Sequence, residues 1–418
     1  MRQDVVVMSH ASLSGVSALR DVPLLRDAVV ERGSRWVYSA GFNVPAVAGR
    51  RELPVSARID SEVADLRRLV RGGARVALLS HQGDGPASAA HLGHVADYLG
   101  HRLGTRVQYV PAAVGGEAVD LAHTMAPGSV TVFGNTRFYA GEQNNDPQLA
   151  AEFAKLGDQV AVGGFSKAHR AHASNVGILA HRPAFLADSV VREVTALDRW
   201  AGTDESHYSV AVLGGMKREK VEVGLAYLVD RYDLVIAGGV VLNALLRAGG
   251  HSIGGSFLGT SADRMVAAAR MVRSRPRRAE LHVASEVFVR AAGNRHADVR
   301  RARVSEPIPD ADMIVDFVLE PWALGRLSGS RGRPVRCLLA GTPALYVDGC
   351  RATTDVILGA FALQGDNALL LGGDTVAELP WSGRRSAGGG SALTFLATGS
   401  CPVLDAMRGR PVSGRRHA

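Results

Sequence analysis

Two lysines that follow a pair of glycines are the residues of this sequence best suited to bind an anion. Lys217 and Lys220 come shortly after Gly214-Gly215, and the glycines follow an apolar run at 210–213. The only other lysines of the chain are Lys155 and Lys167. A buried strand that turns through glycines into a helix can present backbone N–H groups to a phosphate, and lysine is a common point charge on phosphates. The pattern predicts a phosphate site; the alternative is that both lysines are solvated residues of a first helical turn.

A second group of basic and amide side chains follows several short apolar runs in the first half of the chain. Its members are Asn43, Arg58, His81, Asn135, Arg137, Lys167, His169, Arg170 and His172. Ligands of parallel sheets bind at the carboxyl ends of the strands, so these side chains would share one edge that carries several cations and almost no carboxylate. We expect a second anion site there; the alternative is that they are ordinary exposed loop residues.

The segments that must position the second group alternate between apolar runs and amphipathic stretches. The predicted strands are 36–39, 75–79, 106–110, 129–133 and 160–162, and the predicted helices include 61–70 and 90–103. This alternation predicts a mainly parallel sheet with helices on both faces. A long amphipathic helix is predicted at 184–200, between the two halves of the chain.

In the second half of the chain, apolar runs are followed by glycines and then by helical stretches. Gly238-Gly239 follows the run 234–237 and precedes a predicted helix at 240–248. Gly372, Gly373, Asp374 and Thr375 follow the run 368–371, and a further glycine cluster precedes 391–397. We predict an α/β protein with two doubly wound, Rossmann-like parallel-sheet domains. The arginine-rich segment 265–335 gives little structural information.

The bulk composition excludes several classes of protein. At 418 residues, with 46% hydrophobic residues, the chain suits two domains of about 200 residues each. No apolar run is long enough to cross a membrane, and three cysteines favour neither a disulfide framework nor a zinc site. The net charge of +8 raises a nucleic-acid hypothesis, but the basic runs at 273–278, 300–303 and 415–418 lack interleaved aromatic residues, so solvated loops are favoured. We expect a cytoplasmic enzyme that is a monomer and binds neither membranes nor nucleic acid.

The motifs around these residues resemble those of the phosphoglycerate kinase family over nearly the full length of the chain. The segment 163–177, GGFSKAHRAHASNVG, is similar to the family's FGTAHRAH motif and the residues after it. Further matches in the same order are FNVP at 42–45, Ser80-His81, NTRF at 135–138, LGGMK at 213–217, GGDT at 372–375 and SAGGG at 386–390.

The resemblance implies a phosphoglycerate kinase fold, with two domains joined by a hinge helix. It implies an acid-binding domain at 1–185, a hinge helix and linker at 186–206, a nucleotide-binding domain at 207–385, and a C-terminal segment, 386–418, that returns to the first domain. The cofactors would be ATP and Mg²⁺, and the other substrate a small carboxylic acid.

The resemblance also implies roles for individual residues. Asn43, Arg58, His81, Arg137 and Arg170 would line the acid site, with Arg58 orienting the attacking carboxylate. Lys217 would contact nucleotide phosphates, and Asp374 would hold Mg²⁺ beside Thr375. The glycine pairs 214–215, 238–239 and 372–373 would lie along the nucleotide.

Several residues depart from the family pattern. Gly41 stands in place of an aspartate and Ser39 in place of an arginine, while Asp84 stands where the family has an arginine that helps hold a phosphate of 3-phosphoglycerate. A carboxylate beside that phosphate would be repulsive, whereas Asp84 would suit an ammonium or hydroxyl group, and Lys167 adds a cation. The family's second lysine position is Val221, and Lys220 replaces that lysine only if the local turn is distorted.

These departures leave three hypotheses. The leading one is an ATP-dependent phosphotransferase that converts an acid other than 3-phosphoglycerate to an acyl phosphate, which is either released or passed to an amine by a carboxylate–amine ligase. The second is an ordinary phosphoglycerate kinase. The third is a non-catalytic nucleotide-binding protein of the same fold.

Overall fold

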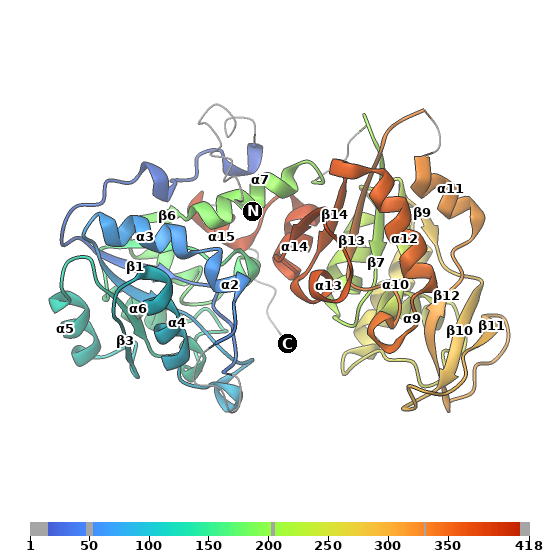
Figure 1. The fold of residues 1–418 in the computed structure, drawn as a ribbon, viewed down its shortest axis with the longest axis horizontal. Coiled ribbons are helices and arrows are strands. Elements are labelled where there is room, and N and C mark those ends of the chain that lie inside the picture. The colour runs from blue at the N-terminus through green and yellow to red at the C-terminus, as the bar shows by residue number, and fades with distance from the viewer. Residues whose placement is uncertain (1–15, 47–52, 202–204, 330–331, 410–418) are drawn as a thin grey trace. The chain divides into compact units, whose positions relative to one another are not determined.

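The computed structural model describes residues 16–46, 53–201, 205–329 and 332–409 (Figure 1). The chain divides into two compact units. The first unit contains the residues up to Asp198 and those from Ser400 onward, and the second contains Arg199–Gly399. The last residues of the predicted C-terminal segment, 410–418, lie outside the described part of the chain, and so does the basic run at 415–418.

The first unit is built on a six-stranded sheet in the order β3-β4-β2-β1-β5-β6, in which every neighbouring pair is parallel. The strands are β1 Arg35–Ser39, β2 Arg75–Leu79, β3 Val107–Val110, β4 Val130–Phe133, β5 Gln159–Val162 and β6 Ala184–Leu186. The helices are α2 Ala57–Asp60, α3 Val63–Arg71, α4 Gly93–Leu103, α5 Gly116–Thr124, α6 Pro147–Ala154, α7 Asp188–Asp198 and α15 Pro402–Met407. The five predicted strands are confirmed to within a residue. Four of them are short, largely buried apolar runs, and β3 is an edge strand with only its first residue buried.

The helix predicted at 184–200 begins later than the sequence suggests. Residues Ala184–Leu186 pair with β5 as the edge strand β6. The helix α7 begins at Asp188, where both carboxylate oxygens of Asp65 accept hydrogen bonds, at 3.0 Å from the N–H of Asp188 and 3.1 Å from that of Ser189. A side chain of α3 therefore caps α7, and that long-range contact is not visible in a helical pattern.

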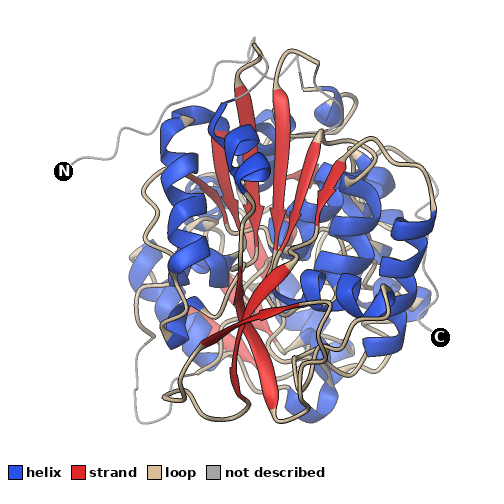
Figure 2. Ribbon diagram, turned by 90° about the vertical axis from the view of Figure 1, so that its right-hand side faces the viewer, coloured by secondary structure: helices blue, strands red, loops and turns tan. Residues whose placement is uncertain are grey.

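The second unit repeats the plan with a parallel sheet in the order β15-β14-β13-β7-β8-β9. Its strands are β7 Tyr208–Leu213, β8 Leu234–Ala237, β9 Glu280–His282, β13 Val335–Ala340, β14 Ala368–Leu371 and β15 Arg384–Ser386. Its helices are α8 Ala226–Leu228, α9 Gly239–Ala248, α10 Ala262–Ser274, α11 Pro321–Gly329, α12 Ala352–Leu363, α13 Gly373–Glu378 and α14 Gly390–Thr398, with a π-helix at Lys220–Leu225. Figure 2 shows helices on either side of the strands.

The arginine-rich segment contributes a separate antiparallel sheet in the order β11-β10-β12. These strands are β10 Glu286–Ala291, β11 Arg300–Arg303 and β12 Asp312–Phe317. The arginines of β11 pair with neighbouring carboxylates, as in the contacts of Arg300 with Asp312 and of Arg301 with Glu286.

Each parallel sheet has a place where two neighbouring strands lead to their next strands in opposite directions. In the first unit it lies between β1 and β5, and in the second it lies between β7 and β13. Ligands of open α/β sheets bind outside the carboxyl ends of the strands at such a place. The residues after β1, β5, β7 and β13 are therefore the ones to inspect. No helix within the described ranges is long and apolar enough to span a membrane.

Candidate functional site

The first unit gathers a cluster of basic side chains at the carboxyl ends of its strands. His81 follows β2, Arg137 lies in a short 3-10 helix after β4, and Lys167 and Arg170 lie after β5. Burial lowers the pKa of His81 well below its usual value, and the positive charges of Arg137, Arg170 and Lys167 lower it further. His81 is therefore a neutral side chain in a strongly cationic site.

Arg137 is the most deeply buried cation of this cluster. Its side chain is 1% exposed, its Nη1 lies 3.6 Å from Glu142 Oε1, and Nη1 donates to Nδ1 of His172 at 3.3 Å. Burial and the nearby Arg137 lower the pKa of His172 to about 3, so this ring accepts as a neutral imidazole and its 3.9 Å contact with Glu142 is not an ion pair. Nε and Nη2 of Arg137 are buried without a hydrogen-bond partner in the part of the chain that the structure describes.

The structure places the other predicted acid-site residues around this cluster. Asn43 Oδ1 accepts from the N–H of Gly83 at 3.3 Å, which ties the segment after β1 to the loop that follows His81. Asp84 lies exposed on the same loop, and its charge acts on Arg137. Arg58 lies on α2 with an exposed side chain.

The expectation that this edge would carry almost no carboxylate is wrong. Glu62 and Glu142 are both buried, and both act electrostatically on Lys167. They were missed because Glu62 comes from the start of a helix and Glu142 from a loop, so neither directly follows a strand. Lys167 is itself buried, and its ammonium donates to Ser39 Oγ and to Asn175 Oδ1. The ammonium of Lys167 is therefore buried behind the surface of the site and is held by protein atoms.

In the second unit, Lys217, Lys220 and Asp374 come together beyond β7 and β14. Lys217 Nζ lies 2.8 Å from Asp374 Oδ2, and both side chains are largely exposed. Burial and then the charge of Lys217 lower the pKa of Lys220 to about 8, while Glu219 and Asp374 act in the opposite direction. Asp374 is in the first turn of α13, where Gly372 has a φ of 108°, a conformation that favours glycine.

The helix predicted after Gly214-Gly215 is distorted. Residues Lys220–Leu225 form a π-helix, which continues into the short helix α8. A π-helical turn contains more residues than an α-helical turn, so it shifts the direction of each side chain relative to a regular helix. The side chain of Lys220 is buried, and the neighbouring Val221 is fully buried in the core.

The expectation that N–H groups after these glycines cradle an anion is wrong for two of them. The N–H of Gly215 donates to the carbonyl of Thr342 at 2.7 Å, and that of Gly239 to the carbonyl of Pro343 at 2.7 Å. A Cβ on Gly214 would lie 2.6 Å from the Thr342 carbonyl oxygen, and one on Gly238 would lie 2.6 Å from that of Pro343. These glycines let the loops after β7, β8 and β13 pack backbone to backbone.

The chemistry of Asp374 fits a magnesium ion that arrives with a nucleotide. Mg²⁺ usually keeps several waters and is held by one or two carboxylates together with substrate phosphates. No group of three or more His, Cys, Asp or Glu side chains in the described ranges could hold a metal. The exposed carboxylate of Asp374 meets this requirement, and Thr375, which carries a hydroxyl, is next to it in sequence.

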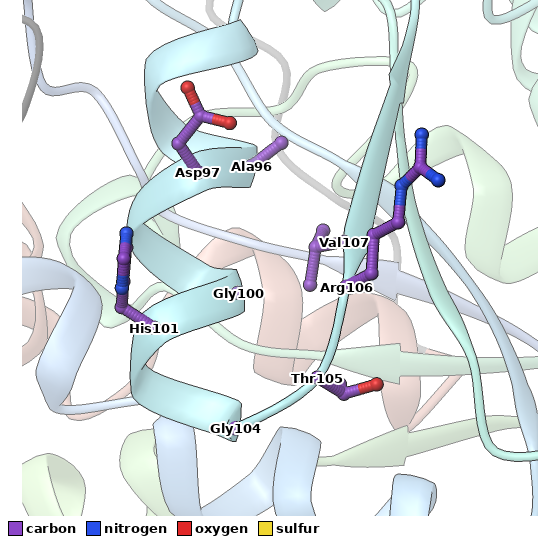
Figure 3. A pocket seen from close by; sticks show the side chains of 8 residues that line it. All are labelled: Ala96, Asp97, Gly100, His101, Gly104, Thr105, Arg106 and Val107. Atoms are coloured by element: carbon purple, nitrogen blue, oxygen red, sulfur yellow. The ribbon is translucent and has the colours of Figure 1, made fainter.

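A surface cavity of about 660 Å³ lies elsewhere in the first unit, between α4 and the start of β3 (Figure 3). It is lined by Ala96, Asp97, Gly100, His101, Gly104, Thr105, Arg106 and Val107. Val107 is the first residue of β3, so the cavity lies at the amino-terminal edge of the sheet, opposite the basic cluster.

Comparisons with known proteins identify the family. The family model described as phosphoglycerate kinase matches residues 27–410. The phosphoglycerate kinase of Granulibacter bethesdensis is 31% identical over 401 residues, which cover 93% of this chain and 97% of that protein. The phosphoglycerate kinase of Zymomonas mobilis is 32% identical over 397 residues, which cover 92% and 96%.

Solved structures agree on the fold. The phosphoglycerate kinase of Coxiella burnetii superposes with a TM-score of 0.71 at 23% identity, covering 93% of this chain and 99% of that one. The enzyme of Pyrococcus horikoshii gives a TM-score of 0.73 at 22% identity, covering 92% and 98%. The chain belongs to the phosphoglycerate kinase family, whose members are kinases that use ATP with Mg²⁺.

Proposed function

We propose that this protein transfers the γ-phosphoryl group of ATP to the carboxylate of 3-phosphoglycerate, giving an acyl phosphate and ADP. The observation that carries the proposal is the buried guanidinium of Arg137, whose Nε and Nη2 have no partner in the described residues although they lie in a cationic cluster. Buried donors are almost always satisfied in proteins, so an anionic ligand is the natural partner of these two groups. The names of the similar proteins favour phosphoglycerate as that ligand.

The acid would act as its own nucleophile. A carboxylate is ionised at neutral pH, so one of its oxygens can attack the γ-phosphorus without a general base. The bond from that phosphorus to the bridging oxygen breaks, and ADP leaves with the electron pair. Arg58 would orient the carboxylate through two parallel hydrogen bonds, while Arg137 and Arg170 would hold the anionic substrate. Asn43 and the neutral His81 would bind its polar groups.

The second unit would bind the nucleotide and stabilise the transferring group. Lys217 would contact the phosphates, and the buried ammonium of Lys220 would offset charge that develops on the equatorial oxygens. With a pKa of about 8, Lys220 remains mostly charged at pH 7. Asp374 and Thr375 would hold Mg²⁺, which neutralises phosphate charge when bound. The backbone of the glycine pairs 214–215, 238–239 and 372–373 would form the surface along which the nucleotide lies.

ADP release tests this proposal. Purified protein with Mg-ATP should release ADP in proportion to added 3-phosphoglycerate, and hydroxylamine should trap the acyl phosphate as a hydroxamate. An Arg137→Met variant should bind Mg-ADP normally but require a much higher concentration of the acid. If ATP and the acid yield no ADP while calorimetry shows nucleotide binding, the result supports the hypothesis of a non-catalytic nucleotide-binding protein.

A second candidate acceptor is an acid without a phosphate, and Asp84 is the observation that favours it. Its carboxylate acts on Arg137, so it would repel a phosphate dianion bound there. The sequence alone makes this the leading hypothesis, but the comparisons favour 3-phosphoglycerate. An Asp84→Arg variant separates the two: it should speed an enzyme for 3-phosphoglycerate and bring no gain to an enzyme for another acid. No observation on the described residues favours an amine acceptor, so we propose that the acyl phosphate is released.

A further inference from the structure

Glu62 and Lys167 bring opposite charges to the junction of β1 and β5 in the first sheet. Both side chains are buried, and neither belongs to a strand. We propose that Glu62 and Lys167 are positioning residues for the acid site: together they fix the segment that carries Asn43 against the segment that carries Arg170. The inference rests on the proposed function, since it concerns the binding of the acid.

Glu62 holds the segment after β1. Its Oε1 accepts a hydrogen bond from the N–H of Gly41 at 3.1 Å, two residues before Asn43. A Cβ on Gly163 would lie 2.1 Å from Glu62 Oε2, and one on Gly41 would lie 2.6 Å from the Cα of Gly164. The absence of a side chain at Gly163 therefore makes the space that the Glu62 carboxylate fills, and the absence of one at Gly41 lets the segments after β1 and β5 approach each other. A substitution at Gly163 would displace the carboxylate, and one at Gly41 would push the two segments apart.

Lys167 holds the segment after β5. Its ammonium donates to Ser39 Oγ, at the end of β1, and to Asn175 Oδ1 at 3.0 Å. Asn175 in turn donates from Nδ2 to the carbonyls of Lys167, at 3.0 Å, and Arg170, at 2.8 Å. The lysine therefore links the end of β1, through the side chain of Asn175, to the backbone of Arg170.

The two departures noted at Ser39 and Gly41 are explained by this arrangement. Where the family has an arginine, Ser39 accepts from the ammonium of Lys167, and where it has an aspartate, the N–H of Gly41 meets the carboxylate of Glu62. One positive and one negative charge are present at the end of β1, although both come from other parts of the chain. The sequence motif is changed, but charges of both signs remain at this position.

Burial makes this arrangement costly and sensitive to pH. Burial raises the pKa of Glu62 to about 7, against the hydrogen bond from Gly41 and the charge of Lys167, while Tyr38 and Asp65 also face it. Burial lowers the pKa of Lys167 to about 8, against the charges of Glu62 and Glu142, and Arg137 lowers it further. Buried charges often stabilise a fold less than apolar residues of the same size would, so a role in the site is a better reason for these two charged side chains than stability.

A Glu62→Gln variant distinguishes positioning from simple charge. Glutamine has nearly the same shape, but its amide carries no charge, so it cannot make a charge-assisted bond to Gly41 or act on the charge of Lys167. If the pair positions the site, the KM for 3-phosphoglycerate should rise about tenfold, with the KM for ATP unchanged. If Glu62 acted only through its negative charge, removing that charge would attract an anionic acid and lower its KM. A lower or unchanged KM overturns the proposal.

Further variants complete the test. Gly163→Ala should displace the carboxylate without changing any charge, so it should also raise the KM of the acid. Gly359→Ala, with nothing near its Cβ, is the matched control.

Lys167→Met should weaken acid binding. The double variant Lys167→Met with Glu62→Gln should bind the acid no worse than either single variant, because the two residues act as a unit. The control for the lysine is Lys155→Met, a change to an exposed lysine on the surface of the same unit. Additive losses overturn the proposal.

Amide hydrogen exchange separates failure of this inference from failure of the proposed function. If the wild-type protein does not turn over 3-phosphoglycerate, the proposed function fails, but exchange in the ligand-free protein still reports on the pair. Exchange at residues 40–45 and 165–172 should be faster in Glu62→Gln than in the wild type at pH 8. Equal exchange in both proteins overturns the inference.

Discussion

The ammonium of Lys217 lies 2.8 Å from the carboxylate of Asp374, although 157 residues separate them in the chain. The two side chains lie beyond different strands of one parallel sheet, so the fold of the second unit brings them together. Both are largely exposed, and an exposed pair of this kind contributes at most about 1 kcal/mol to stability. Their proximity is therefore better explained by a ligand than by stability.

Replacing Lys217 by methionine should weaken nucleotide binding without unfolding the protein. The variant loses a point charge on the phosphates, so we expect the Kd of Mg-ADP to rise about tenfold or more in titration calorimetry. The unfolding free energy should change by less than about 1 kcal/mol. Lys155→Met is the matched control. If the two variants bind Mg-ADP with equal affinity, Lys217 is not part of the nucleotide site.

Replacing Arg137 by methionine should destabilise the first unit strongly. The change leaves the carboxylate of Glu142, which is 1% exposed, without its guanidinium partner. Breaking a buried pair typically costs about 3–5 kcal/mol of unfolding free energy, measurable by urea denaturation. The additional change Glu142→Gln should recover part of that loss. If the double variant is less stable than the single one, the two charges do not form a pair.

Because of the π-helical turn, we expect that the lysine at position 220 cannot be moved to position 221. The double change Lys220→Val with Val221→Lys moves the ammonium to a fully buried core position, where an unpaired charge is costly. We expect this double variant to lose much of its unfolding free energy.

The single change Lys220→Met should leave the fold intact and lower kcat about 100-fold or more, with a smaller effect on the Kd of Mg-ADP. If kcat is unchanged, Lys220 has no part in the transfer.

Acid should destabilise the first unit through its buried histidines. Burial lowers the pKa of His169 and His172 to about 3 and that of His81 well below its usual value. Because these folded-state pKa values lie below those of the unfolded chain, their contribution is fully present above pH 6.5 and is lost as the pH falls. The loss is at most about 1.4 kcal/mol per pH unit for each histidine.

Glu62 acts with the opposite sign, since its raised pKa means that its contribution is lost as the pH rises through about 7. In a Glu62→Gln variant, the opposing contribution of Glu62 is absent, so the contribution of the histidines to the pH dependence of stability can be measured. In that background, urea denaturation should give an unfolding free energy that falls from pH 7 to pH 5, and His172→Gln should reduce the slope. A flat profile would show that the rings are not buried as neutral groups.

The strand–turn pattern of the sequence was sufficient to predict most of the fold. The runs that became β1, β2, β4 and β7 are short, apolar and followed by polar or glycine residues, which is the signature of a buried parallel strand. The edge strand β6 was missed because Ala184–Leu186 continues into a helical pattern. The antiparallel sheet was missed because β11 is rich in exposed arginine, so its strand identity depends on pairing with β10.

The candidate site was predicted in part, for a similar reason. Residues directly after strands, such as His81 and Arg137, could be found because their position in the motif fixes their place at the sheet edge. Glu62 could not be found in this way, since it reaches the edge from the start of α3. The glycines at 41 and 163 were a hint in the sequence that a side chain from elsewhere enters the site. Two missing side chains close to the junction of β1 and β5 leave space that other residues must fill. The distortion at Lys220 has no counterpart in local sequence pattern.

The initial rate of ADP release, measured at saturating Mg-ATP with 3-phosphoglycerate and with an equimolar series of unphosphorylated hydroxy and amino acids, tests the central proposal most directly. We predict that 3-phosphoglycerate gives the highest kcat/KM and that Arg137→Met abolishes the difference among the acids. A higher kcat/KM for an unphosphorylated acid, unchanged by that substitution, would contradict it.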